Sequence, residues 1–136
     1  MALGLHVTLR NNMLDEITAR AGGSAVIRIY NDPQPGTSEA ITTQTKLAQL
    51  TCNSTFAPAA TAGKLTLNGI STQTSADNSG TATWFRILAQ DLTTIVLDGT
   101  VSSTAAATGD LQLDNNVIVG GGSVAISSAE ITAGNA

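Results

Sequence analysis

The hydrophobic pattern of this chain changes its period once, at the adjacent glycines Gly22 and Gly23, and does not change back. Upstream of these glycines, apolar residues recur at a helical spacing, at Leu9, Met13, Ile17 and Ala21. Downstream, apolar and polar residues alternate with the period of two that is typical of a strand. The pattern predicts one helix over residues 9–21, followed by strands alone.

The predicted helix is preceded by an N-terminal arm, residues 1–8. Thr8 is a residue type that commonly caps a helix N-terminus, and the glycine pair after residue 21 is a stop signal. Within the arm, Leu3, Leu5 and Val7 alternate with other residues. An apolar arm of this length can lie in a groove or add a strand to an exposed sheet edge. We therefore predict Leu3, Leu5 and Val7 as candidate contacts with a partner.

Short strands are predicted for the rest of the chain. Residues 25–30 alternate and end at a loop rich in proline and glycine, and the alternating runs 82–89 and 94–101 are predicted to pair as a hairpin. Trp84 and Phe85 are adjacent on one of these runs, so their side chains must point to opposite faces. Weaker alternation predicts further strands at 46–51, 63–70, 111–113, 117–119 and 124–128.

One helix followed by about eight or nine short strands is typical of an antiparallel β-sandwich or barrel. Parallel strands need long crossovers, and no second helical pattern separates the strands, so a doubly wound α/β sheet is disfavoured. The chain has 136 residues, the usual length of one domain. We predict a single, mainly β domain over 1–136, with a β-sandwich over 25–131 and a flexible tail at 132–136.

The charge pattern argues against two kinds of partner. Only 12 % of the residues are charged and the net charge is −4. The basic residues are scattered, at Arg10, Arg20, Arg28, Lys46, Lys64 and Arg86. Nucleic-acid binding needs clustered cations, so we expect none, and no apolar run is long enough to predict a membrane span or a secretory signal. A sparsely charged surface is easily desolvated, so we expect this chain to function in contact with another protein.

The residue types that carry most enzyme chemistry are few. His6 is the only histidine and Cys52 the only cysteine, so no internal disulfide is possible. Because a terminal histidine is hard to hold in a catalytic geometry, we predict His6 to be an ordinary exposed or interface residue. Cys52 follows an alternating strand with no base nearby in sequence, so we predict a small buried hydrophobe. One Cys and one His do not supply a zinc site.

The carboxylates and glycines do not form a recognisable site. Asp77, Asp110 and Asp114 lack the spacing of a calcium loop, and we predict solvated turn carboxylates. Asp91 and Asp98 could pair across the predicted hairpin, but no aromatic residues accompany them for binding a sugar. The glycines at 120–122 precede a strand rather than a helix, so we predict a turn and not a phosphate loop. We therefore predict no catalytic, cofactor-binding or metal-binding residues and no enzymatic activity.

Several stretches of the sequence resemble a group of small virion proteins of tailed bacteriophages and prophages. After the helix that ends in glycines, the resemblance is carried by VIRIYNDPQP at 26–35, KLAQL at 46–50, TSADNSGTATWFR at 74–86 and DGTV at 98–101. It spans most of the chain. The resemblance implies a capsid cement or decoration protein, with a jelly-roll-like β-sandwich that clamps neighbouring subunits of the major capsid protein.

The resemblance also implies a setting and leaves alternatives open. The implied partners are the major capsid protein and further copies of this chain on the capsid lattice. The protein would fold in the host cytoplasm and end in the virion. A tail or neck connector is an alternative, and a carbohydrate-binding adsorption module is a less favoured one. The resemblance carries no catalytic or cofactor residues over to this chain.

Overall fold

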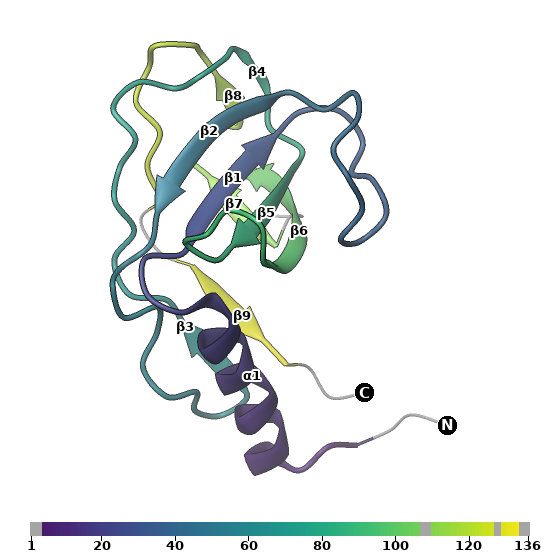
Figure 1. Ribbon diagram of the computed structural model, residues 1–136, viewed down its shortest axis with the longest axis vertical. Helices are drawn as coiled ribbons and strands as arrows, with labels where there is room; N and C mark the ends of the chain where they lie inside the picture. The colour runs from purple at the N-terminus through teal and green to yellow at the C-terminus, as the bar shows by residue number, and fades with distance from the viewer. Residues whose placement is uncertain (1–3, 107–109, 127–128, 134–136) are drawn as a thin grey trace.

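The computed structural model describes residues 4–106, 110–126 and 129–133 (Figure 1). Over these ranges the chain forms one helix and nine short strands. In chain order these are α1 (Val7–Ala21), β1 (Val26–Tyr30), β2 (Lys46–Thr51), β3 (Lys64–Thr66), β4 (Gly80–Thr81), β5 (Trp84–Leu88), β6 (Ile95–Ser103), β7 (Leu111–Leu113), β8 (Val117–Ile118) and β9 (Glu130–Thr132). The prediction of a mainly β chain with one N-terminal helix is confirmed. No helix within the described residues is long and apolar enough to span a membrane.

The main sheet is five-stranded and curled, with the strand order β2-β1-β5-β6-β7. Two further pairs, β4–β8 and β3–β9, lie at opposite ends of it, and α1 lies beside β3 and β9 (Figure 1). The wholly antiparallel sandwich is not confirmed, because β7 runs parallel to β6, with Leu111 beside Val101. The antiparallel prediction rested on the absence of long or helical crossovers, but the link from β6 to β7 is shorter than the dozen residues that parallel neighbours usually need.

The helix begins earlier than its pattern indicates. It starts at Val7 rather than residue 9, and the predicted cap Thr8 is wrong. His6 is the N-cap: its backbone is extended, and its Nδ1 accepts a hydrogen bond from the Thr8 N–H at 3.2 Å. A side-chain acceptor at this position satisfies one of the free N–H groups of the first turn. The predicted end is confirmed, since Gly22 adopts a positive φ of 67° and its N–H donates to the Thr18 carbonyl.

The predicted hairpin is confirmed, with β5 and β6 paired antiparallel in the centre of the sheet. All five residues of β5 are buried, so both faces of the strand are covered. Phe85 and Ile87 point into the main hydrophobic core. On the opposite face, Trp84 stacks on Tyr30 with the ring centroids 4.5 Å apart, and only 1 % of Trp84 is exposed.

The C-terminal region differs most from the prediction. Val124 forms only an isolated bridge with Gln73, and part of the predicted strand 124–128 lies outside the described residues. The last strand is β9 instead, which pairs with β3. Thr132 belongs to β9, and the Ala133 N–H donates to the Gly63 carbonyl at 2.9 Å, so the predicted flexible tail is ordered at its first two residues. Residues 134–136 lie outside the described part.

Candidate functional site

The two predicted contact residues that the structure describes, Leu5 and Val7, lie in different segments. Leu3 lies outside the described residues, and Leu5 is partly buried in the segment before the helix. Val7 is the first residue of α1 and is 38 % exposed. The arm predicted over residues 1–8 therefore ends at His6, and Val7 belongs to the helix surface.

The exposed side of α1 carries two larger apolar side chains, both from the run of apolar residues that predicted the helix. Leu9 is 47 % exposed and Met13 is 49 % exposed, and they are neighbours on one face because they stand four residues apart. The fully buried helix residues are Leu14 and Ala21. Each four-residue step advances about 40° around a helix, so the run from Leu9 to Ala21 does not stay on one side.

Polar side chains on the inner side of α1 fix the helix against its neighbours. The Asn11 Oδ1 accepts from the Gly63 N–H at 2.9 Å, and the Asp15 Oδ1 accepts from the Ala60 N–H at 2.8 Å. The Arg10 Nη1 donates to the Ala133 carbonyl at 3.1 Å, just beyond β9. The exposed apolar pair is therefore displayed from a helix that is anchored to both β3 and β9.

The most deeply buried charges form an ion pair across the hairpin. The Arg86 Nε and Nη2 bond to the two Asp98 carboxylate oxygens at 2.7 and 2.9 Å, and the two side chains are 5 % and 0 % exposed. The Arg86 Nη1 donates to the Glu39 carbonyl, and the Ser38 N–H donates to Asp98. The guanidinium also lies 5.3 Å from the centre of the Trp84 ring. The pair ties the long β1–β2 connection to the sheet.

The same contacts set the ionisation of Asp98. Burial raises the pKa of its carboxyl, but the hydrogen bonds from Arg86 and Ser38 and the charge of Arg86 together lower that pKa below its usual value. Asp91, its predicted partner as a paired carboxylate, lies in the hairpin turn. The Thr94 and Thr93 N–H groups bond to Asp91 and lower its pKa to about 2. The two carboxylates therefore serve separate structural contacts.

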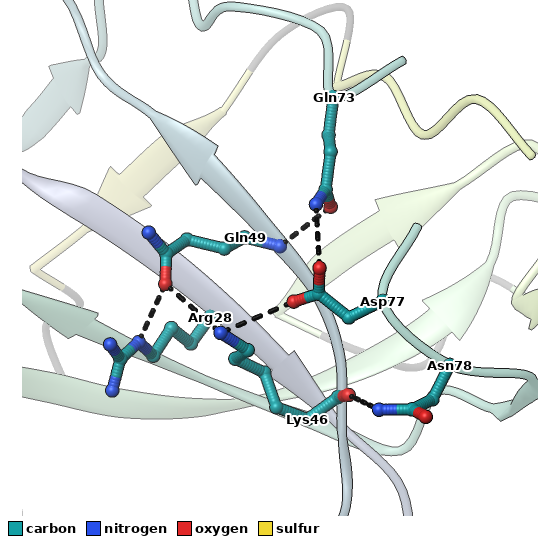
Figure 2. Close-up of polar contacts among 6 residues, drawn as sticks. All are labelled: Arg28, Lys46, Gln49, Gln73, Asp77 and Asn78. Atoms are coloured by element: carbon teal, nitrogen blue, oxygen red, sulfur yellow. Dashed lines mark hydrogen bonds and ion pairs between the residues drawn. The ribbon is translucent and has the colours of Figure 1, made fainter. Parts of the chain in front are cut away.

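A second polar group covers the outer edge of β2 (Figure 2). The Gln73 side chain accepts from the Gln49 N–H at 2.8 Å and donates to Asp77 at 3.2 Å. The Asn78 side chain donates to the Lys46 carbonyl at 2.9 Å. Edge strands expose backbone groups that can pair with other chains, so these contacts close this edge of the sheet.

Side chains on the face of the sheet extend this group. Lys46 forms an ion pair with Asp77 at 3.2 Å, and its Nζ also donates to the Gln49 side chain (Figure 2). The Arg28 Nε donates to the same Gln49 oxygen at 2.9 Å. Every member of this cluster bonds within the cluster, which is the arrangement of a structural network rather than of a ligand site.

Other candidate residues lie apart from one another. Cys52 is buried, and burial raises the pKa of its thiol to about 11. His6 is exposed and caps the helix. Asp110 accepts from the Thr100 N–H at 3.0 Å and is exposed. Within the described ranges, no three His, Cys, Asp or Glu side chains gather as metal ligands. The predicted turn at the glycines near 121 is confirmed by a bond from the Gly122 N–H to the Val119 carbonyl.

The aromatic side chains are all in the interior. Trp84, Phe56, Tyr30 and Phe85 are between 1 % and 7 % exposed. A carbohydrate-binding module stacks exposed rings on sugars. The four aromatic rings of this chain are therefore not exposed for stacking on a sugar, as a carbohydrate-binding module would require.

No protein-family model, no curated protein and no solved structure matches this chain.

Proposed function

We propose that this chain is a non-enzymatic structural protein of a bacteriophage virion, of the capsid cement or decoration type. It would bind across neighbouring subunits of the major capsid protein and stabilise the shell. The observation that carries the proposal is the exposed apolar pair Leu9 and Met13 on the anchored helix α1. The resemblance to small virion proteins supplies the setting.

The chemistry of this helix surface suits a protein contact. Leu9 and Met13 are each about half covered already, and a partner that covers the rest gains roughly 25 cal/mol for each Å² of apolar surface. A single contact of this size is weak. On a capsid lattice, however, it is repeated at every equivalent position, and linked weak contacts give strong overall binding.

The proposal also includes the fold: we infer that the two layers form a jelly-roll-like β-sandwich. Its support is the position of the β3–β9 pair, because Leu65 packs in the same core as Ile27 and Phe85 of the main sheet. A second layer over a curled sheet is the basic arrangement of a sandwich.

The test is occupancy on capsids. Empty capsids would be mixed with the wild-type chain, with the double variant Leu9→Ser and Met13→Ser, and with Val119→Ser as a matched control. Val119 is 65 % exposed but lies just after β8, at the other end of the molecule from α1 (Figure 1). We expect the double variant to lose most of its occupancy by gel densitometry and the control to keep it.

Two results would count against the proposal. If the double variant bound capsids as well as the wild type, Leu9 and Met13 would not form the contact with the capsid. A copy number that corresponds to one ring per particle, rather than to the capsid lattice, would favour the neck connector instead.

A further inference from the structure

A groove of about 460 Å³ lies between β9 and the core side of the main sheet. Its wall is mostly apolar and comes from β1, β5, β6, β7 and β9, with Ile27, Phe85, Ile87, Leu97, Leu111 and Ile131. Protein sites for small molecules and peptide side chains commonly have volumes of about 300–1,000 Å³ and apolar walls of this kind. The groove is thus large enough to receive apolar side chains from outside.

One edge of β9 faces away from β3, the strand with which it pairs. The Leu67 N–H donates to the Ala129 carbonyl and the Ala133 N–H donates to the Gly63 carbonyl, both at 2.9 Å. In an antiparallel pair, hydrogen-bonded positions alternate with positions whose N–H and C=O groups point outward. Glu130 and Thr132 are at these outward positions, and both line the groove. Among the described residues, no strand other than β3 pairs with β9.

We propose that this groove binds an extended peptide segment of another protein, which adds a strand beside β9. The segment would bond to the outward groups of Glu130 and Thr132 and place alternate apolar side chains in the groove, where Leu97 and Ile131 are only partly buried. Such strand addition takes affinity from backbone hydrogen bonds and specificity from the side-chain pockets. Because β9 has three residues, the added strand needs to span only about 10 Å.

The charge of the groove indicates which residues should flank the apolar part of the bound segment. The groove wall contains Asp98, Asp110 and Glu130 and no basic residue. Asp98 is paired with Arg86, and Glu130 lies 3.5 Å from Lys64. Within the described part, Asp110 bonds only to Thr100, so its carboxylate is available to a cation. The segment should therefore carry Lys or Arg beside its apolar residues.

The β2 edge makes a useful contrast, because the side chains of Gln73 and Asn78 close it. The groove also does not include Leu9 or Met13, the pair on which the proposed capsid contact rests. Either proposal can therefore fail without the other.

The experiment is an NMR titration of the full chain with a blocked heptapeptide, Lys-Val-Thr-Val-Thr-Val-Lys, and with the same sequence flanked by Glu. We expect the Lys peptide to shift the Glu130 and Thr132 amide signals at or below about 1 mM and to bind more tightly than the Glu peptide. The Asp110→Asn variant should reduce that preference. Absence of these shifts with the wild-type chain would overturn the proposal.

Two proline variants separate strand addition from general disruption. Thr132→Pro removes an outward N–H without removing a β3–β9 bond, and should weaken peptide binding about tenfold. Thr66→Pro is the matched control, because Thr66 stands opposite Glu130 and its own N–H points to the far side of β3. Equal effects of the two variants would refute the mode of binding.

Two further measurements identify the occupant. Self-association in sedimentation that Thr132→Pro abolishes would show a second copy in the groove and would overturn the assignment to another protein. The variant with Leu9→Ser and Met13→Ser should still bind the Lys peptide with unchanged affinity. Loss of peptide binding in that variant would contradict the separation of the two surfaces.

Discussion

Replacement of Asp98 by Asn would leave the Arg86 guanidinium buried without a countercharge. The change keeps the shape of the side chain but removes the charge from a bidentate pair that is 5 % and 0 % exposed. Removal of one partner from a buried ion pair typically costs about 3–5 kcal/mol. Domains of this size are commonly stable by about 5–15 kcal/mol, so the loss would be a large part of the total. We expect Asp98→Asn to lower the free energy of unfolding by that amount.

The assay is urea unfolding followed by Trp84 fluorescence. Trp84 is the only tryptophan, is stacked on Tyr30 and lies beside Arg86, so its emission reports the loss of this region. Glu130→Gln is the control, because the Lys64–Glu130 pair is about half exposed and should be worth less than about 1 kcal/mol. A cost for Asp98→Asn no larger than that of the control would refute the reasoning.

The pH dependence gives a second readout of the same pair. Because the pKa of Asp98 is lower in the folded chain than in the unfolded chain, the folded state binds this proton less readily. Its contribution to stability is complete above the unfolded pKa of about 4 and is lost as the pH falls through the folded value. Wild type should therefore lose more stability than Asp98→Asn on acidification below about pH 4. Parallel pH profiles would contradict this assignment.

Three further predictions concern other contacts. Gly63→Ala should destabilise the chain by at least about 1–2 kcal/mol in urea, because Gly63 has a φ of 73° and an added Cβ would collide with Arg10. Arg10→Ala should relieve the collision but not the backbone strain, which a double-mutant cycle would show. Gln73→Ala should cost about 1 kcal/mol and speed hydrogen exchange at the Gln49 amide, since that N–H loses its acceptor. Cys52, with its pKa raised to about 11, should react with iodoacetamide at pH 8 only after denaturation, and rapid labelling of the native chain would contradict its burial.

The elements with long, regular signals were predictable from the sequence. The end of α1 follows from the glycine pair, and the β5–β6 hairpin follows from two alternating runs with a short link. β9 was not predictable, because Glu130, Ile131 and Thr132 are too few to show a period. It exists because Leu65 of β3 lies opposite Ile131, a contact between residues far apart in the chain.

The polar contacts were less predictable than the strands. Sequence placed Arg86 and Asp98 on two strands of one hairpin but did not give their register. That register includes an irregularity after Ile87, which no local signal marks. In the same way, the alternation of β2 gives no sign that Gln73, from a distant loop, bonds to the Gln49 amide. Such pairings depend on how the sheet closes, and side-chain patterns report only which face a residue occupies.

The distribution of the cations supports the two proposed contacts, both of which use apolar and backbone groups rather than basic side chains. All six basic side chains already have partners within the protein: Arg10 with Ala133, Arg20 with Ile95, Arg28 with Gln49, Lys46 with Asp77, Lys64 with Glu130 and Arg86 with Asp98. A partner that needed several of these cations would have to compete with those contacts. The helix pair Leu9 and Met13 requires no such exchange, nor does the edge of β9 that carries no strand within the described residues. Covering them removes apolar surface from water and satisfies outward backbone groups, while the internal ion pairs stay intact.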